Sequence, residues 1–102
     1  MNIKHPEIYK TFICSTAHIR KEDSDRLDKN KSDFLMFDLY PFGWNIIIDP
    51  SYKEEGFKKN FIEDGFSEEF YNILITAEEL GCNRLCLDKD GSEYEELPKF
   101  DW

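Results

Sequence analysis

The chain has 102 residues, with 13 Lys and Arg against 22 Asp and Glu, and a formal net charge of −9 at pH 7. A protein this acidic repels nucleic acid and anionic membranes, so we expect neither as a direct partner. The N-terminus has no apolar export segment and no apolar run approaches the ~20 residues of a membrane span. We therefore expect a cytoplasmic protein with a single domain over residues 1–102.

The first third of the chain predicts a strand followed by a short helix. Residues 9–14 form a β-prone apolar stretch, and Ser15-Thr16 after it suits a turn or a helix N-cap. Residues 19–29 are strongly charged with two apolar anchors, which is typical of a surface helix. Residues 30–33 are polar and are expected to form a loop.

The middle of the chain predicts a β-hairpin. Residues 34–40 are rich in aromatic and apolar side chains, and residues 44–49 contain the β-branched run Ile46–Ile48. Pro41-Phe42-Gly43 between them supplies turn residues. Three successive isoleucines predict that both faces of the second strand are covered, either within the chain or by a second copy in a homodimer.

The second half predicts a long loop and then the clearest helix. Residues 50–65 contain Pro, two Gly and many charges, and we expect a long variable loop with one helical turn around 57–62. Residues 68–80 follow the i, i+3, i+4, i+7 apolar pattern of a helix with one buried face. Ser67 before this helix is a good N-cap, and Gly81 after it is a natural helix terminator.

The chain ends in a predicted strand and a docked tail. Residues 83–88 alternate apolar and polar, and Asp90-Gly91 indicates a turn. Residues 92–102 are acidic but carry large apolar side chains near the end, so we expect this tail to dock on the body. The overall order is β-α-β-β-α-β. It predicts an α+β two-layer sandwich with the ferredoxin-like (split βαβ) order, a mostly antiparallel sheet and two helices on one face.

Several stretches together resemble an uncharacterised family of small bacterial proteins of plasmids and prophages. They are Ile13-Cys14-Ser15-Thr16-Ala17-His18-Ile19, then Gly81-Cys82 with Leu85, Leu87-Asp88 and Asp90-Gly91, and finally Leu97-Pro98 with Phe100-Asp101-Trp102. The resemblance implies a genetic context of mobile-element cargo, near antirestriction and toxin–antitoxin genes. It implies no particular activity.

Cysteine and histidine are the residues with the clearest potential for chemistry. Cys14 and His18 lie four residues apart at a strand end, where a Cys–His pair can generate a thiolate nucleophile. Cys82 and Cys86 have a spacing within the loose range of zinc sites. We favour buried thiols and a packed histidine, because Cys ranks among the most buried residue types. We therefore expect no cofactor and no metal.

Negative charge is concentrated in the second half of the chain. Residues 1–50 hold seven Lys/Arg and eight Asp/Glu, whereas residues 51–102 hold six and fourteen. Acids on the second helix and after the last strand, with two aromatic residues as possible hot spots, predict a surface that binds a basic protein. The predicted partner-binding residues are Glu68, Glu69, Glu78, Glu79, Asp88, Asp90, Glu93, Glu95, Glu96, Tyr94 and Trp102.

The leading hypothesis from sequence is a non-enzymatic acidic interaction protein of a mobile element. In its sharper form, the protein inhibits a host defence nuclease, of the anti-restriction or anti-CRISPR type, by occupying its basic nucleic-acid-binding groove. The alternatives are a small Cys14–His18 enzyme or metal-binding module, and a toxin–antitoxin accessory protein.

Overall fold

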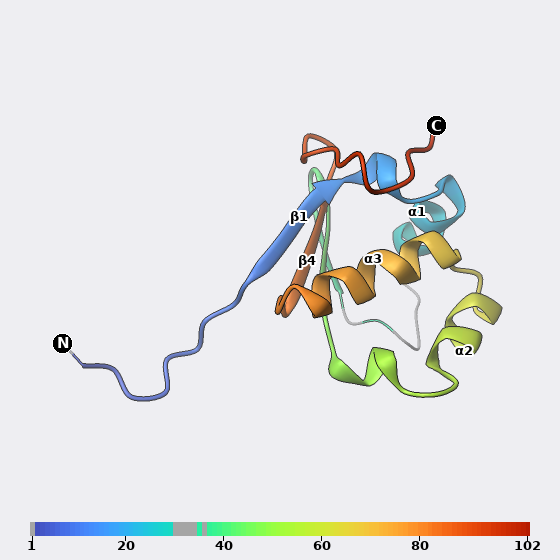
Figure 1. Ribbon diagram of the computed structural model, residues 1–102. Coiled ribbons are helices and arrows are strands. Elements are labelled where there is room, and N and C mark those ends of the chain that lie inside the picture. Colours follow the sequence, from blue (N-terminus) through green and yellow to red (C-terminus); the bar gives the residue numbers. More distant parts are fainter. Residues whose placement is uncertain (1, 30–34, 36) are drawn as a thin grey trace.

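A computed structural model describes residues 2–29, 35 and 37–102. The described residues form an α+β domain in which a four-stranded mixed sheet carries its helices on one face (Figure 1). The elements, in chain order, are β1 (Thr11–Ser15), the 3-10 helix η1 (Thr16–His18), α1 (Lys21–Asp28), β2 (Phe37–Tyr40), β3 (Gly43–Ile47), the 3-10 helix η2 (Pro50–Lys53), α2 (Phe57–Glu63), α3 (Glu68–Glu79) and β4 (Arg84–Asp88).

The ferredoxin-like order that the sequence predicted is not the order of this sheet. The strands lie in the order β1-β4-β3-β2, with β1 parallel to β4 and the other two pairings antiparallel. β4 is a central strand whose Leu85 and Leu87 are fully buried, whereas β1 is an edge strand with Ile13 49% exposed. Exchanging these two strands in space leaves the order along the chain unchanged, so the sequence pattern could not distinguish the two arrangements.

The core lies between the inner face of the sheet and the helices. Cys14, Trp44, Ile46, Leu85 and Leu87 alternate with outward-facing residues, as the period of two along a strand requires. These five side chains and the apolar stripe of α3 belong to one buried hydrophobic cluster. Ile46 and Ile48 are both buried in this core, so the chain itself covers one face of the isoleucine run, whereas Ile47 on the other face is half-buried.

Helix α3 confirms the strongest prediction from the sequence. The Ser67 hydroxyl accepts a hydrogen bond from the Phe70 amide at 3.1 Å, and Gly81 follows the helix with a positive φ of 80°. The stripe that faces the sheet is fully buried and consists of Phe70, Ile73, Leu74 and Ala77. The cap, the apolar stripe and the terminator all lie within one local segment, so the sequence alone was sufficient to predict this helix.

The segment 50–65 was expected to be a long loop with one helical turn around 57–62. It contains η2 as well, and the predicted turn is the helix α2. Asp49 caps η2 by accepting a hydrogen bond from the Ser51 amide at 2.9 Å. Gly56, at φ 88°, begins α2. Stacked aromatic rings then hold α2 in place, with Phe57 at 4.7 Å from Tyr52 and Phe61 at 4.6 Å from Phe66 between ring centroids.

The other predicted elements are found with shifted ends. β1, α1, β3 and β4 lie within or one residue beyond the predicted strand and helix ranges, and β2 covers the second half of the predicted strand 34–40. The predicted loop at 30–33, together with Phe34 and Met36 of that strand, lies outside the described residues. None of the helices among the described residues is both long and apolar enough to cross a membrane.

The chain before β1 extends away from the body (Figure 1). Its last residue, Lys10, is held through hydrogen bonds between its backbone and Asn83, and the ring of Tyr9 lies 3.9 Å from the Arg84 guanidinium carbon. Ile3 and Ile8 are 66% and 74% exposed. The domain thus begins at β1, with a short extended segment ahead of it.

Candidate functional site

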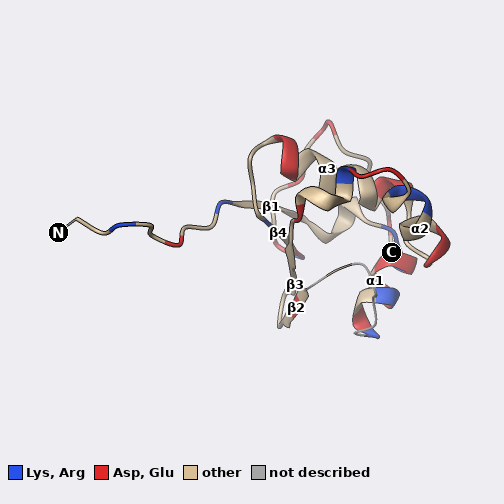
Figure 2. Ribbon diagram, turned by 90° about the horizontal axis from the view of Figure 1, so that it is seen from below, with Lys and Arg blue, Asp and Glu red and all other residues tan. Residues whose placement is uncertain are grey.

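The acids predicted to bind a partner fall into two groups in the structure. Those on α3 are largely paired with cations from other elements, so little of their charge is available to a partner. Figure 2 marks the acidic residues along the chain in red and the Lys and Arg residues in blue. The ion pairs join Glu68 to Lys58 at 2.8 Å, Glu69 to Arg20 at 2.5 Å, and Glu78 to Lys53 at 2.7 Å. The ends of this twelve-residue helix are also about 17 Å apart, so its acids do not form one compact cluster.

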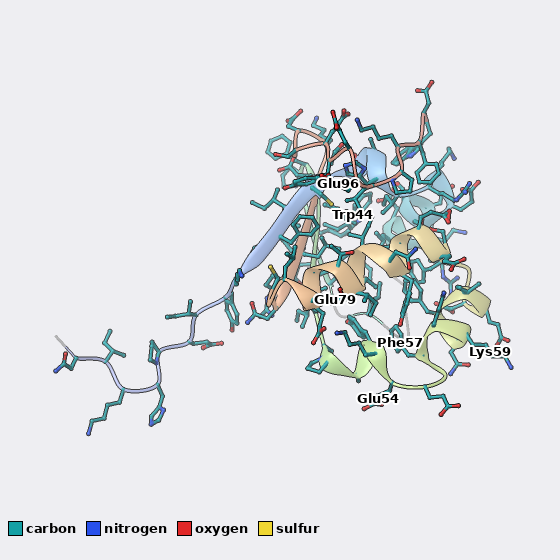
Figure 3. The ribbon with its side chains drawn as sticks, in the orientation of Figure 1. Trp44, Glu54, Phe57, Lys59, Glu79 and Glu96 are labelled. Atoms are coloured by element: carbon teal, nitrogen blue, oxygen red, sulfur yellow. The ribbon has the colours of Figure 1, made fainter. Side chains whose placement is uncertain are left out.

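The second group of acids lies on the C-terminal segment, residues 89–102, and on Asp88 just before it. Asp90, Glu93, Glu95 and Glu96 are all exposed, and Figure 3 shows Glu96 at the end of the molecule where this segment crosses the sheet. Glu93 lies 3.7 Å from Lys99, a long contact at an exposed site. The C-terminal segment is therefore the part of the predicted surface that retains its negative charge.

His18 fastens the C-terminal segment to the body. Its ring is fully buried, Nδ1 lies 2.7 Å from the Pro98 carbonyl oxygen, and Nε2 lies 2.9 Å from the Tyr94 amide nitrogen. A carbonyl only accepts and an amide N–H only donates, so Nδ1 carries the proton and Nε2 accepts. A neutral histidine with this one tautomer thus bridges the residues on the two sides of the turn at 95–96.

Further hydrogen bonds continue the attachment on both sides of His18. The Ser15 amide donates to the Ser92 carbonyl at 2.8 Å, and the Phe100 amide donates to the Ala17 carbonyl at 2.7 Å. The two predicted hot-spot aromatics take part, because the Tyr94 hydroxyl donates to the Ile13 carbonyl and the Trp102 indole donates to the Ile19 carbonyl, both at 2.9 Å. Trp102 nevertheless keeps 51% of its surface exposed.

The geometry does not favour Cys14 and His18 as a catalytic pair. Both ring nitrogens of His18 are occupied by backbone groups, so neither is available to accept a proton from a thiol. Cys14 is fully buried on the inner face of the sheet, and burial raises the pKa of its thiol to about 12. A thiol of this kind is a packing group rather than a nucleophile.

We expect Cys14 to resist alkylation in the folded protein. With a pKa near 12, only about one thiol in 10⁴ is ionised at pH 8, and iodoacetamide cannot reach a side chain without exposed surface. Mass spectrometry of the peptide containing Cys14 should show labelling in urea and almost none under native conditions. Equal labelling rates in the two conditions would restore the enzyme hypothesis.

The other two cysteines do not complete a metal site. Cys82 is buried just ahead of β4. Cys86 is half-buried on β4 and lies opposite Ile13 of β1, so its side chain is on the other face of the sheet from that of Cys14. In the described part of the chain, no group of three or more His, Cys, Asp or Glu side chains is placed to hold a metal ion.

Residues 11–102 match the C-terminal domain of DUF5983, a family of unknown function. The chain belongs to this family. The matched range begins at β1 and includes the whole sheet and the C-terminal segment, so the DUF5983 domain and the folded body coincide. No curated protein and no solved structure matches the chain.

The roles of two residues at this site of the DUF5983 domain were not identified from sequence. A packed His18 was favoured over a partner of Cys14, and its full burial confirms this, but its hydrogen bonds to the C-terminal segment were not predicted. Arg20 was read as a surface charge, but its guanidinium carbon lies 4.5 Å from the centre of the Phe100 ring and adds a cation–π contact to the segment. Both act on residues about 80 positions away, which no local pattern reveals.

Proposed function

We propose that this DUF5983 domain is a non-enzymatic interaction protein that binds a basic protein surface through its C-terminal segment. The observation that carries the proposal is the combination of a fastened backbone and free charges: His18 holds the segment at Tyr94 and Pro98, while Glu95 and Glu96 stay exposed. A charge array that is already ordered loses little entropy on binding, and complementary charge accelerates encounter.

The finer form of the proposal names the partner. We infer that the partner is the nucleic-acid-binding groove of a host defence nuclease, and that the chain acts in the cytoplasm as an inhibitor of the anti-restriction or anti-CRISPR type, carried by a plasmid or prophage. Such a groove is basic because it neutralises phosphates. A domain with a net charge of −9 and exposed acids on an ordered segment has the opposite charge.

We expect loss of three exposed acids in the C-terminal segment to weaken partner binding at least about tenfold. The variant is Asp90→Asn with Glu95→Gln and Glu96→Gln, which changes the net charge from −9 to −6. The measurement is pull-down from a bacterial host lysate at about 50 mM and about 500 mM salt, since surface electrostatics are screened at the higher concentration. Basic proteins should be retained by the wild type at low salt only.

A matched control separates the site from the overall charge. Glu54, Glu55 and Glu63 are exposed and lie around α2, away from the C-terminal segment (Figure 3, Glu54). Their replacement by Gln also gives a net charge of −6 and should leave retention close to wild type. If both triple variants lose the partner equally, the C-terminal segment is not the binding surface. The finer form is tested by measuring DNA cleavage by the captured nuclease. The wild type and the control variant should inhibit cleavage, whereas the variant of Asp90, Glu95 and Glu96 should not.

A further inference from the structure

One face of the sheet is open in the described part of the chain. The helices lie on the opposite face (Figure 1), and this outer face carries the alternate side chains of the strands. Ile13 on β1 is 49% exposed, and Cys86, its neighbour on β4, is half-buried, as is Ile47 on β3. Asp88 is the one predicted partner-binding acid that belongs to a strand. The outer face is thus a surface distinct from that of the proposed function.

The two charged residues of β4 lie at opposite ends of this outer face. Arg84 begins the strand and Asp88 ends it, about 13 Å away along the strand, with Cys86 midway between them. Neither forms an ion pair with another residue that the structure describes. The Arg84 guanidinium carbon lies 3.9 Å from the centre of the Tyr9 ring, and the Asp88 carboxylate accepts from the Asp90 amide at 2.8 Å. The face therefore carries a cation at one end and an anion at the other.

Such a face is complementary to itself. A two-fold axis that crosses β4 at Cys86, between two facing sheets, makes the two β4 strands antiparallel and places Arg84 of each copy opposite Asp88 of the other. Ile47 pairs with Arg84 and Gly43 pairs with Asp88 within the sheet. Ile47 therefore lies opposite Gly43 of the second copy, where a large side chain meets a position without one. An axis parallel to the strands opposes Arg84 to Arg84 instead, which is repulsive.

The segment before β1, residues 2–10, projects from the body on the same side as the outer face (Figures 1 and 2). Its Ile3 and Ile8 are 66% and 74% exposed, so they have little contact with their own body. Four strands of this length cover only roughly 300 Å², whereas a stable interface buries about 800 Å² per partner. A second copy seated on the outer face lies within reach of this segment, which supplies the missing area.

We propose that the outer face of the sheet binds the same face of a second copy across this two-fold axis, and that segment 2–10 of each copy packs against the other. Ile13 and Cys86 form the centre of the contact. The pairs of Arg84 with Asp88 of the other copy fix its direction. Asp38 of β2 meets its own equivalent at the rim, where solvent screens the repulsion.

Sedimentation equilibrium of the full chain tests the proposal through a charge swap. The wild type should change from one chain of 12.2 kDa to two as its concentration rises, with a Kd below about 100 µM. Arg84→Glu and Asp88→Arg should each weaken the dimer at least about tenfold, because each opposes like charges twice. The double variant restores opposite charges and should return to within about threefold of the wild type. Damage to the fold by one change would not be repaired by the other.

Two further variants complete the test. Lys59→Glu on α2 changes the net charge as Arg84→Glu does, but lies on the side of the helices (Figure 3), and it should leave the Kd unchanged. Ile3→Ser with Ile8→Ser should weaken the dimer at least about tenfold. A chain that stays monomeric up to about 1 mM, or a dimer that the single reversals weaken no more than Lys59→Glu does, would overturn the proposal.

A short bismaleimide locates the contact. Cys86 faces its own equivalent across about 10 Å, too far for a disulfide, whereas Cys14 and Cys82 are buried. Linked dimers on a denaturing gel should form in the wild type and disappear in Cys86→Ser, and linking that persists in Cys86→Ser would contradict this interface. Partner pull-down with the variants of the C-terminal segment is measured separately, so failure of the homodimer is distinguishable from failure of the proposed function.

Discussion

Replacing His18 with Ala is expected to lower the free energy of unfolding by about 2–4 kcal/mol. The ring has no exposed surface, and each of its nitrogens bonds a backbone group of the C-terminal segment. The substitution leaves the Pro98 carbonyl and the Tyr94 amide without their partners and creates a cavity at the same time. Urea denaturation followed by circular dichroism measures the loss.

Hydrogen exchange gives a second, local measurement of the same variant. The Tyr94 amide is protected by His18 and the Phe100 amide by the Ala17 carbonyl, so both should exchange faster in His18→Ala even before global unfolding. His5→Ala is the matched control, since His5 is exposed in the segment before β1. A loss below about 0.5 kcal/mol, with unchanged exchange at Tyr94, would mean that His18 does not fasten the segment.

The link between His18 and the partner surface follows from the same geometry. If the C-terminal segment is the binding surface, releasing it from the body should weaken the binding of the partner without removing any acidic side chain. The His18→Ala protein, tested at a temperature where it is still folded, is therefore expected to bind the basic partner less tightly than the His5→Ala control. The cause is the entropy of ordering a released segment on binding.

Local sequence signals predicted the elements but not their arrangement. Ser67, the apolar stripe and Gly81 all lie within α3 or beside it, and they predicted that helix almost to the residue. α2 was predicted only as one helical turn within a loop, because its support is tertiary: Phe61 stacks on Phe66 and Phe57 on Tyr52. The position of β4 between β1 and β3 likewise depends on long-range pairing.

The candidate sites show the same limit more strongly. The acids of the C-terminal segment could be read directly from the sequence, but the cations that neutralise those of α3, such as Arg20 and Lys53, come from distant elements. His18 likewise bonds Tyr94 and Pro98, which lie about 80 positions away and which no motif connects to it. Sites made from single residues of several elements become visible only when the fold is known.

Replacing Asp23 with Ala is expected to cost about 2–4 kcal/mol of stability. Asp23 is fully buried and accepts hydrogen bonds from the Arg20 amide at 3.0 Å, the Ser67 amide at 2.7 Å and the Ser67 hydroxyl at 2.6 Å. Arg20 begins α1 and Ser67 begins α3. One carboxylate thus holds the starts of two helices, and its removal affects both.

The control for this variant is Asp25→Ala on the same helix, which removes the same charge. Asp25 is exposed and pairs with Lys21 at 3.1 Å, a surface contact worth at most about 1 kcal/mol. Urea denaturation of the two variants should therefore give clearly different losses. Equal losses would show that Asp23 does not link α1 to α3.

The pH dependence of stability gives an independent test of the buried carboxylate. Burial raises the pKa of Asp23 above its ordinary value of 3.8, and the hydrogen bonds from Ser67 and Arg20 only partly oppose this effect. The folded protein therefore takes up the proton at higher pH than the unfolded chain. The stability that results is fully present below pH 3.8 and is lost as the pH rises through the folded pKa.

Asp23→Asn cannot titrate, so the stability of the wild type relative to this variant should increase as the pH falls toward 3.8. Parallel stability profiles for the two proteins would contradict a raised pKa at this site, whereas a diverging pair would show that neutral Asp23 is better accommodated than its anion.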